Sequence, residues 1–313
     1  MEQVKEFNPI ETARKVENSY REYIATTIHF ADSDLQDQLE NILKRPGYLA
    51  KGPFLEAAPP YRKDKTVAEL VDEGTLCKGM MSLGGGNPDH FDPNRPLYVH
   101  QVEAIEKAVR GRNYAVVTGT GSGKTECFLL PILNDILSEF EERGCSAGVR
   151  AMILYPMNAL ANDQLKRLRM LLEGTDITFG RYTGDTEETD KKALRKWKEE
   201  NPGQVKLSNE IISREEIRKN PPNILLTNYS MLEYLLLRPE DAPLFGGVFG
   251  VNWRHIAIDE AHIYSGALGT EIAYLLRRLK ARIESETGEQ PRLRCYATSA
   301  TIGTEKDMPK VAK

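Results

Sequence analysis

Cysteine is scarce in this sequence, and the four present stand far apart, at Cys77, Cys127, Cys145 and Cys295. There is no CxxC pair and no histidine at zinc-ligand spacing from a cysteine, which excludes both a disulfide framework and a zinc site from our expectations. The five histidines are equally dispersed, so each is first interpreted as an ordinary surface or core residue. This cysteine usage suits a reducing compartment, and we expect a cytoplasmic protein.

Long hydrophobic runs are also missing. The N-terminal segment is polar from its first residues, unlike a signal peptide. Apolar runs such as Ile224–Leu226 are far too short to cross a bilayer. Because 40% of the residues are nevertheless hydrophobic and 28% are charged, we expect a soluble globular protein with a real core and no membrane partner.

Neither sign of charge dominates the chain. The formal net charge of −4 gives no support for a nucleic-acid partner. It does not exclude one either, because local patches rather than totals determine contact with phosphates. Any such assignment must therefore come from motifs.

The N-terminal part of the chain has a helical pattern. Periodic apolar residues predict helices over Thr12–Phe30 and Asp34–Leu43, the second capped by Ser33 or Asp34. A link rich in proline and glycine follows, and then a short helix over Val67–Glu73.

Further along, short apolar runs alternate with amphipathic segments. Runs of this length, separated by helical patterns, indicate an α/β fold in which helices flank both faces of a parallel sheet. The runs are Tyr114–Val117, Ala151–Tyr155, Ile177–Tyr182, Asn223–Leu226, His255–Ile258 and Arg294–Ala297.

We predict two regions, a mainly helical accessory region at 1–95 and an α/β domain at 96–313. The glycine- and proline-rich stretch 82–96 is predicted to be a loop at their boundary. A polar insertion at 187–222 interrupts the α/β pattern, and its residues 191–219 carry nine Lys or Arg against five Glu. Such a charge run is typical of a solvated face, and an added nucleic-acid contact stays open as the alternative.

A glycine-rich loop, TGTGSGKT, stands between the run YAVV and a helical pattern. Its three glycines allow a tight turn that aims N–H groups at phosphate oxygens, and the helix that follows adds its positive end. A lysine here can reach the β- and γ-phosphates, and the next hydroxyl can ligate Mg²⁺. The loop departs from the full phosphate-loop signature at its first position, where threonine replaces glycine. We predict an ATP site formed by Thr118, Gly119, Thr120, Gly121, Ser122, Gly123, Lys124 and Thr125.

An acidic pair ends the run His255–Ile258. A carboxylate at the end of a buried strand is costly unless it serves a cation, so Asp259 is predicted to hold Mg²⁺ together with Thr125. Glu260 is predicted to orient and deprotonate the water that attacks the γ-phosphate, with Lys124 as the third catalytic residue. The segment Thr298–Thr301 is expected to follow the last strand and to lie near these carboxylates.

In this order, TGSGKT, DEAH and SAT resemble motifs I, II and III of the superfamily-two DEAD/DEAH-box helicases. The resemblance implies a first RecA-like lobe that uses ATP and Mg²⁺. It also implies that Gln101 recognises adenine, with Tyr98 packed near it. By the same resemblance, His262, Ser299 and Thr301 couple hydrolysis to movement.

Three further segments are similar to the strand-gripping motifs of that family: YPMNALANDQLKRL, RYTGDT and ILLTNYSMLEYLL. Taken singly, their polar residues are typical helix caps. In this order they predict a phosphodiester track without base readout. The residues leave DNA against RNA open, and it is the family resemblance that favours single-stranded DNA as the partner. The predicted contacts are Pro156, Asn158, Gln164, Thr183, Gly184, Thr227 and Asn228.

The likeness extends over the whole chain to the YprA-like bacterial DNA helicases, which include members in DNA repair and in phage-defence systems. It therefore implies a role in one of these two pathways, with other subunits of a defence system as potential partners. After DEAH, Ile272, Leu275 and Leu279 lie on one face of a predicted helix, and arginines lie off that face. Whether these arginines are functional or simply solvated stays open.

The chain stops at Lys313, shortly after SAT, and the family's second RecA-like lobe is expected in cis or in trans. That lobe supplies an arginine worth roughly 10³–10⁵ in rate. We therefore expect weak hydrolysis by this chain alone, as the N-terminal part of a longer protein or half of a split enzyme. The alternatives are an ATP-gated nucleic-acid-binding module without turnover and, less favoured, a phosphate-loop ATPase of another class.

Overall fold

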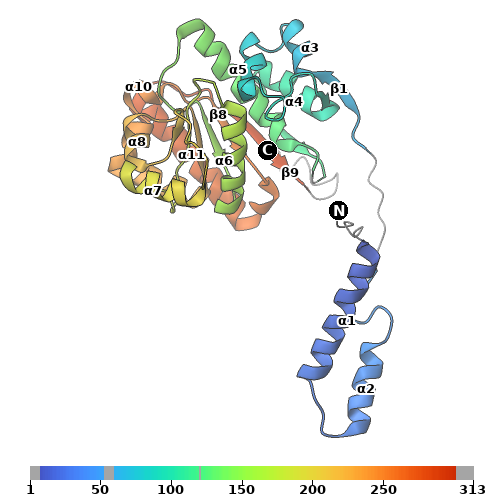
Figure 1. Cartoon of the computed structure of the whole chain (residues 1–313). Helices are drawn as coiled ribbons and strands as arrows, with labels where there is room; N and C mark the ends of the chain where they lie inside the picture. Colours follow the sequence, from blue (N-terminus) through green and yellow to red (C-terminus); the bar gives the residue numbers. More distant parts are fainter. Residues whose placement is uncertain (1–7, 53–59, 120, 301–313) are drawn as a thin grey trace. The chain divides into compact units, whose positions relative to one another are not determined.

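A computed structural model describes residues 8–52, 60–119 and 121–300 (Figure 1). The chain forms two compact units, Met1–Pro60 and Tyr61–Lys313. The second unit contains the sheet.

The first unit is a pair of helices, α1 (Pro9–Thr27) and α2 (Ser33–Leu43). Asn8 caps α1, since its side chain accepts hydrogen bonds from two amide groups of the first turn. Asp32 caps α2 in the same way, so the prediction of Ser33 or Asp34 as the cap was wrong. Only Leu43 is buried within either helix.

The second unit is built on a seven-stranded sheet in which every pairing is parallel, with the order β3-β9-β8-β4-β7-β5-β6. The predicted α/β class is confirmed, and each of the six predicted runs overlaps a strand, although β7 and β9 extend past the predicted ends. The strands are β3 (Tyr114–Val117), β4 (Ala151–Leu154), β5 (Phe179–Arg181), β6 (Glu210–Ile211), β7 (Ile224–Thr227), β8 (His255–Ile258) and β9 (Arg294–Ser299).

Each face of the sheet has its own apolar core, because successive strand residues point to opposite sides. In β4, Ala151 and Ile153 face one core, while Met152 and Leu154 face the other. The first core is covered by α4 (Val99–Val109), α5 (Lys124–Arg143) and α6 (Asn158–Leu172). The second is covered by α8 (Arg214–Lys219), α9 (Tyr229–Leu237) and α11 (Gly266–Thr287), so helices flank both faces as predicted (Figure 1). Short helical turns η2 (Pro239–Leu244), α10 (Gly247–Gly250) and η3 (Ala261–Ile263) complete this side.

The segment just before the sheet packs into the first core. It contains α3 (Val67–Asp72), the 3₁₀ segment η1 (Lys78–Gly86) and an antiparallel pair, β1 (Lys63–Thr66) with β2 (Pro96–Tyr98). The buried side chains of α3 and η1 join those of α4, α5 and α6. The compact unit therefore begins upstream of residue 96, where composition suggested a boundary.

The polar insertion is part of the same fold. It contains α7 (Asp190–Glu200), β6 and α8. Strand β6 pairs with β5 and extends the sheet at its edge. This strand was not predicted, because two residues within a polar stretch give no periodic signal.

In the part of the chain that the structure describes, none of the helices has the length and apolar character needed to cross a membrane.

A charged cluster joins α5 to the start of β8 and β9. Asp135 accepts hydrogen bonds from Arg254 and Arg294, and its Oδ2 lies 3.0 Å from Nε2 of His255. Burial alone would raise the pKa of Asp135, but the histidine and both arginines outweigh it and hold the pKa well below its usual range. Burial, together with the nearby Arg294 and Arg254, lowers the pKa of His255 against the opposing effect of Asp135.

This cluster predicts an acid-sensitive fold. A lowered folded-state pKa for His255 means that the unfolded chain takes up the proton first, so stability is complete above the unfolded pKa of about 6.5 and is lost below it. We expect the Tm to fall more steeply on acidification for wild type than for His255→Gln, which cannot titrate. Thermal melting at a series of pH values above and below about 6.5 measures the difference in slope. The exposed His29→Gln serves as control. Equal slopes for wild type and His255→Gln would contradict the prediction.

Candidate nucleotide and nucleic-acid site

The carboxyl ends of three adjacent parallel strands bring the predicted nucleotide residues together. Strand β9 lies between β3 and β8. Val117 is aligned with Ser299, and Ile258 with Ala297, so the phosphate loop, Asp259 and Ser299 emerge at one edge of the sheet. Open α/β sheets bind ligands outside this edge.

The phosphate loop curls between β3 and α5. Gly121 and Gly123 adopt φ of +78° and +70°, which are conformations that favour glycine. The hydroxyls of Thr118 and Ser122 share a hydrogen bond of 2.6 Å across the curl. Helix α5 begins at Lys124, so its positive end faces the loop, and Thr125 lies in the first turn. Thr120 lies outside the described residues.

Lys124 is held inside the curl by backbone oxygens. Its Nζ donates hydrogen bonds of 3.0 Å to the carbonyls of Thr118 and Gly119. The side chain is largely buried, at 9% exposure. A buried ammonium next to several backbone N–H groups suits an anionic ligand.

Gln101 contacts the phosphate loop directly. It is buried, and its amide nitrogen donates to the carbonyl of Gly123 at 2.9 Å. Its amide oxygen accepts from the N–H of Tyr98 at 2.7 Å. Gln101 is therefore not the surface glutamine that a helical position suggests by default, and it links the start of α4 to the start of α5.

A cavity of about 360 Å³ opens beside this link, within the size range of small-molecule sites. Tyr98, Gln101, Gly121 and Gly123 line it, and the segment 88–92 and helix α6 add further walls. The segment upstream of residue 96 thus forms part of the wall of the nucleotide region.

Two aromatic residues of this region were missed at the sequence level. The rings of Tyr61, Tyr98 and His100 contact one another, with centroids 5.4 to 5.7 Å apart. Nε2 of His100 lies 2.9 Å from the carbonyl of Ser122. No local signal identifies Tyr61, because only the β1–β2 pairing places it against the rings near α4.

The acidic pair follows β8 in an unusual backbone conformation. Asp259 is 8% exposed and accepts hydrogen bonds from the Thr298 hydroxyl and the N–H of Glu260. Glu260, at φ +50°, is the only non-glycine residue with positive φ in the described ranges. Such a conformation costs about 1–2 kcal/mol and is retained where surrounding structure enforces it.

The Thr298–Thr301 segment differs from its prediction. Thr298 and Ser299 are the last residues of β9, not a turn that follows it, and Thr301 lies outside the described residues. Oγ of Ser299 lies 3.2 Å from Nδ1 of His262, which in turn lies 3.3 Å from Oε2 of Glu260. Thr298 was not among the predicted site residues, although its hydroxyl contacts Asp259 directly.

The donor set fits a hard divalent ion. The Asp259 carboxylate follows β8, the Thr125 hydroxyl belongs to the first turn of α5, and Oε2 of Glu260 is a buried acceptor without a hydrogen bond. In the described part of the chain, no group of three or more His, Cys, Asp or Glu is arranged to hold a metal. Two oxygen donors, one from Thr125 and one from Asp259, suit Mg²⁺, which is commonly held by one or two protein oxygens with phosphates and water as its other ligands.

The predicted strand-gripping residues also converge at the carboxyl edge. Asn158, the first residue of α6, donates to the Asp185 carboxylate at 2.9 Å and accepts from the Asn228 amide at 2.8 Å. Asn228 also caps α9 by accepting from the N–H of Met231. Segments that follow β4, β5 and β7 thus share one hydrogen-bonded polar cluster.

The two predicted threonines lie beneath this surface. Thr183 and Thr227 are fully buried. The Thr227 hydroxyl donates to the carbonyl of Tyr182 at 2.7 Å, so it joins β7 to the loop after β5 and does not face solvent. Gly184 has open space around its Cα, whereas Pro156, just before α6, and Gln164, midway along α6, are half-buried.

With this geometry in place, comparison with known proteins identifies the class. Residues 98–308 match the model of the DEAD/DEAH box helicase family, which is most of the chain. The chain belongs to the DEAD/DEAH box helicase family, a superfamily-two group of ATP-dependent helicases.

Within this family, the chain is similar to three particular proteins. The chain is 30% identical to Druantia protein DruE of Escherichia coli (strain UMEA 4076-1), over 97% of this chain and 21% of that protein. It is 32% identical to the uncharacterized ATP-dependent helicase YprA of Bacillus subtilis (strain 168), over 81% of this chain and 28% of that protein. The crystal structure of the DUF1998 helicase MrfA bound to DNA and AMPPNP is similar at 29% identity and a TM-score of 0.55, over 80% of this chain and 29% of that one.

The contact between Gly123 and Gln101 is testable by substitution. A Cβ at Gly123 would overlap the Gln101 amide nitrogen, whereas Gly111, at φ +72°, has open space around it. We expect Gly111→Ala to cost about 1 kcal/mol of unfolding free energy, from backbone strain alone. Gly123→Ala should cost about 1 kcal/mol more, because it also breaks the Gln101 hydrogen bond. Urea denaturation measures both, and equal losses would show that the Gln101 contact adds nothing.

Proposed function

We propose that this chain is the ATP-binding lobe of a helicase or translocase that converts ATP hydrolysis into movement along nucleic acid, with single-stranded DNA favoured. The observation that carries the proposal is the shared sheet edge of β3, β9 and β8, where Lys124, Asp259 and Glu260 lie. Family membership supports the same activity.

In this proposal, the phosphate loop cradles the triphosphate. The backbone N–H groups of the loop and the start of α5 bind phosphate oxygens, and Lys124 turns from its two carbonyl acceptors to the β- and γ-phosphates. Gln101 stays fixed on Gly123 and presents its remaining hydrogen-bonding capacity to the adenine. Tyr98 lines the cavity beside it.

Thr125 and Asp259 would hold Mg²⁺, which supplies charge neutralisation on the β- and γ-phosphates when bound. The Thr298 hydroxyl keeps the Asp259 carboxylate oriented toward this position. Glu260 orients the attacking water and accepts its proton. Nδ1 of His262 lies 3.3 Å from the Glu260 carboxylate, so the loss of negative charge on Glu260 changes its electrostatic interaction with His262.

His262 and Ser299 are proposed to couple hydrolysis to movement, together with Thr301. The support is the chain of contacts from Glu260 through His262 to the end of β9. A second RecA-like lobe, in cis or in trans, would supply the arginine that completes the catalytic site.

The nucleic-acid track is proposed along the ends of β4, β7 and β5. Pro156, Asn158, Gln164 and Gly184 lie along it, and Asn228 holds the start of α9 in place for backbone contacts. The buried Thr183 and Thr227 would shape the loops from below. These groups suit phosphates more than base edges, so binding should depend weakly on sequence and strongly on salt.

The biological setting is proposed from the relatives. The likeness to a Druantia protein suggests anti-phage defence, with other subunits of such a system as partners. The chain spans only 21–28% of the curated relatives described above, so their whole-protein activities carry over as proposals alone.

The decisive measurement is the ATPase rate of the full-length protein, with single-stranded DNA, duplex DNA and RNA compared. We expect stimulation that is strongest with single-stranded DNA. Binding of nucleic acid in an ATP-dependent manner with no hydrolysis under any condition would favour a clamp instead of a motor.

Glu260→Gln tests the base assignment. The amide keeps the size of the side chain, so ATP affinity should stay near that of wild type. Turnover should fall by about 10²–10⁴-fold, the usual contribution of a general base. Fluorescent nucleotide binding and phosphate release measure the two quantities, and Glu271→Gln, on the exposed side of α11, is the matched control. Retained turnover would remove Glu260 from this role.

A further inference from the structure

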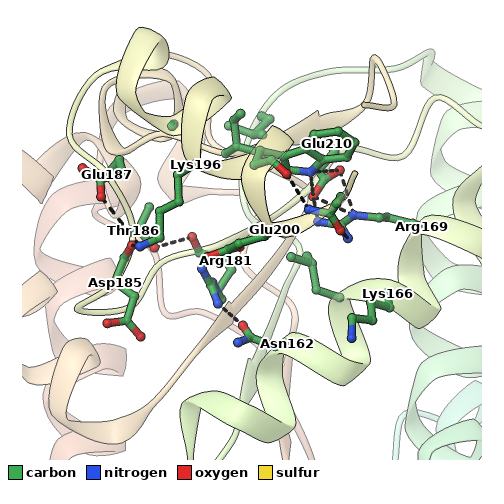
Figure 2. Close-up of a pocket in the computed structure, with 16 residues that line it drawn as sticks. Asn162, Lys166, Arg169, Arg181, Asp185, Thr186, Glu187, Lys196, Glu200 and Glu210 are labelled. Atoms are coloured by element: carbon green, nitrogen blue, oxygen red, sulfur yellow. Dashed lines mark hydrogen bonds and ion pairs between the residues drawn. The ribbon is translucent and has the colours of Figure 1, made fainter. Parts of the chain in front are cut away.

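The polar insertion meets the loop that follows β5 around a second cavity of about 360 Å³ (Figure 2). Helix α6, the loop at 185–187 and helix α7 form its walls, and the buried Glu210 of β6 lies at its floor. Arg169 clamps the Glu210 carboxylate, and the Trp197 indole also donates to it. The ion pair joins β6 to α6, and the indole hydrogen bond adds α7 to the same carboxylate.

Two cationic side chains of the insertion, Arg214 and Lys196, donate to three consecutive backbone carbonyls of the loop 183–185. The guanidinium of Arg214 donates to the carbonyls of Thr183 and Gly184, at 3.2 and 3.1 Å. Nζ of Lys196 donates to the carbonyl of Asp185 at 2.7 Å, and Figure 2 shows it between Asp185 and Glu187. Hydrogen bonds from two different helices thus hold one short stretch of backbone.

Within the insertion, backbone hydrogen bonds join its first residues, directly after the loop, to the start of α8. The N–H of Arg214 donates to the carbonyl of Glu187, and the N–H of Glu215 donates to that of Glu188. The Arg214 guanidinium also lies 5.5 Å from the centre of the Tyr182 ring. Arg214 therefore contacts the loop at three places and is only 16% exposed.

The carbonyl side of the loop is thus turned toward the insertion. On the other side, Asp185 contacts Asn158, which belongs to the hydrogen-bonded cluster with Asn228. Consecutive peptide carbonyls that are held on one side orient the intervening N–H groups, which are the donors that a phosphate backbone needs.

We propose that Arg214 and Lys196 are positioning residues that brace the loop 183–185 for nucleic-acid binding, and that the insertion acts through this loop and not as a strand-binding surface itself. This inference rests on the proposed function, because it gives the braced loop a nucleic-acid partner. The cations need not touch the strand, since Nη2 of Arg214 and Nζ of Lys196 already donate to backbone carbonyls of the loop.

The test compares charge removal at braced and unbraced positions in the full-length protein. Lys196→Ala and Lys198→Ala each remove one lysine from α7, but Lys198 is exposed and contacts none of the three carbonyls. Arg214→Ala is matched by Arg195→Ala, whose side chain is 83% exposed. The readouts are the single-stranded DNA concentration for half-maximal ATPase, the basal rate, the KM for ATP and the Tm.

We expect Arg214→Ala to raise the half-maximal DNA concentration roughly tenfold, as for loss of one charge-assisted hydrogen bond, and Lys196→Ala to raise it about threefold. Arg214→Lys should lie between wild type and Arg214→Ala. Basal rate and KM for ATP should stay unchanged in every variant. Because Lys196 is partly exposed, its variant should fold even if Arg214→Ala does not.

Salt dependence separates bracing from direct contact. Removing a cation that touches phosphate lowers the slope of log K against log salt by about 0.7 for single strands, whereas removing a brace leaves it unchanged. An altered slope for Lys196→Ala, or equal weakening by Lys196→Ala and Lys198→Ala, would overturn the proposal. If wild type itself shows no DNA stimulation, the proposed function fails; if wild type responds and the braced variants match their controls, only this inference fails.

Discussion

The parallel pairing of β8 with β9 is the constraint on which the nucleotide site depends. Its register sets Ile258 beside Ala297, which places Asp259 next to Thr298 and allows the hydrogen bond between their side chains. A slip of one residue would turn Thr298 to the opposite face of the sheet. Glu260, directly after this hydrogen-bonded aspartate, adopts the left-handed conformation at the start of η3. The geometry of the Asp259 carboxylate thus depends on strand register as well as on the side chains themselves.

The same edge serves two halves with different chemistry. Strands β3, β9 and β8 lead to the phosphate loop, Ser299 and the acidic pair. Strands β4, β7 and β5 lead to the cluster of Asn158, Asn228 and Asp185. Tyr264, just after the acidic pair, contacts Tyr229 of α9 edge to face at 6.1 Å. Burial, with the Tyr229 ring and Asp259 nearby, raises the pKa of Tyr264 to about 12, so this phenol stays neutral. The two halves therefore adjoin through an uncharged aromatic contact.

Segments outside the common motifs support both halves. Residues 61–98 complete the first core and wall the cavity beside Gln101. The insertion extends the sheet through β6 and fastens the loop after β5. In each case polar or glycine-rich sequence is tied in by buried contacts, such as the Arg169–Glu210 ion pair. Removing one partner of such a buried pair is strongly destabilising, because the other charge is left buried and uncompensated.

The amino-acid sequence alone determined the α/β class, six of the seven strands of the main sheet and the family, because four-residue apolar runs and the TGSGKT, DEAH and SAT motifs are local patterns. It could not reveal β6, Tyr61 or the contact of Thr298 with Asp259, which arise from partners distant in the chain. Nor could it show that Thr183 and Thr227 are buried, whereas Asn158 and Asn228 form a hydrogen bond with each other. A short polar residue near the end of a strand gives the same sequence pattern whether it is buried or exposed. Tertiary structure decided these points, because burial and pairing depend on which strands become neighbours.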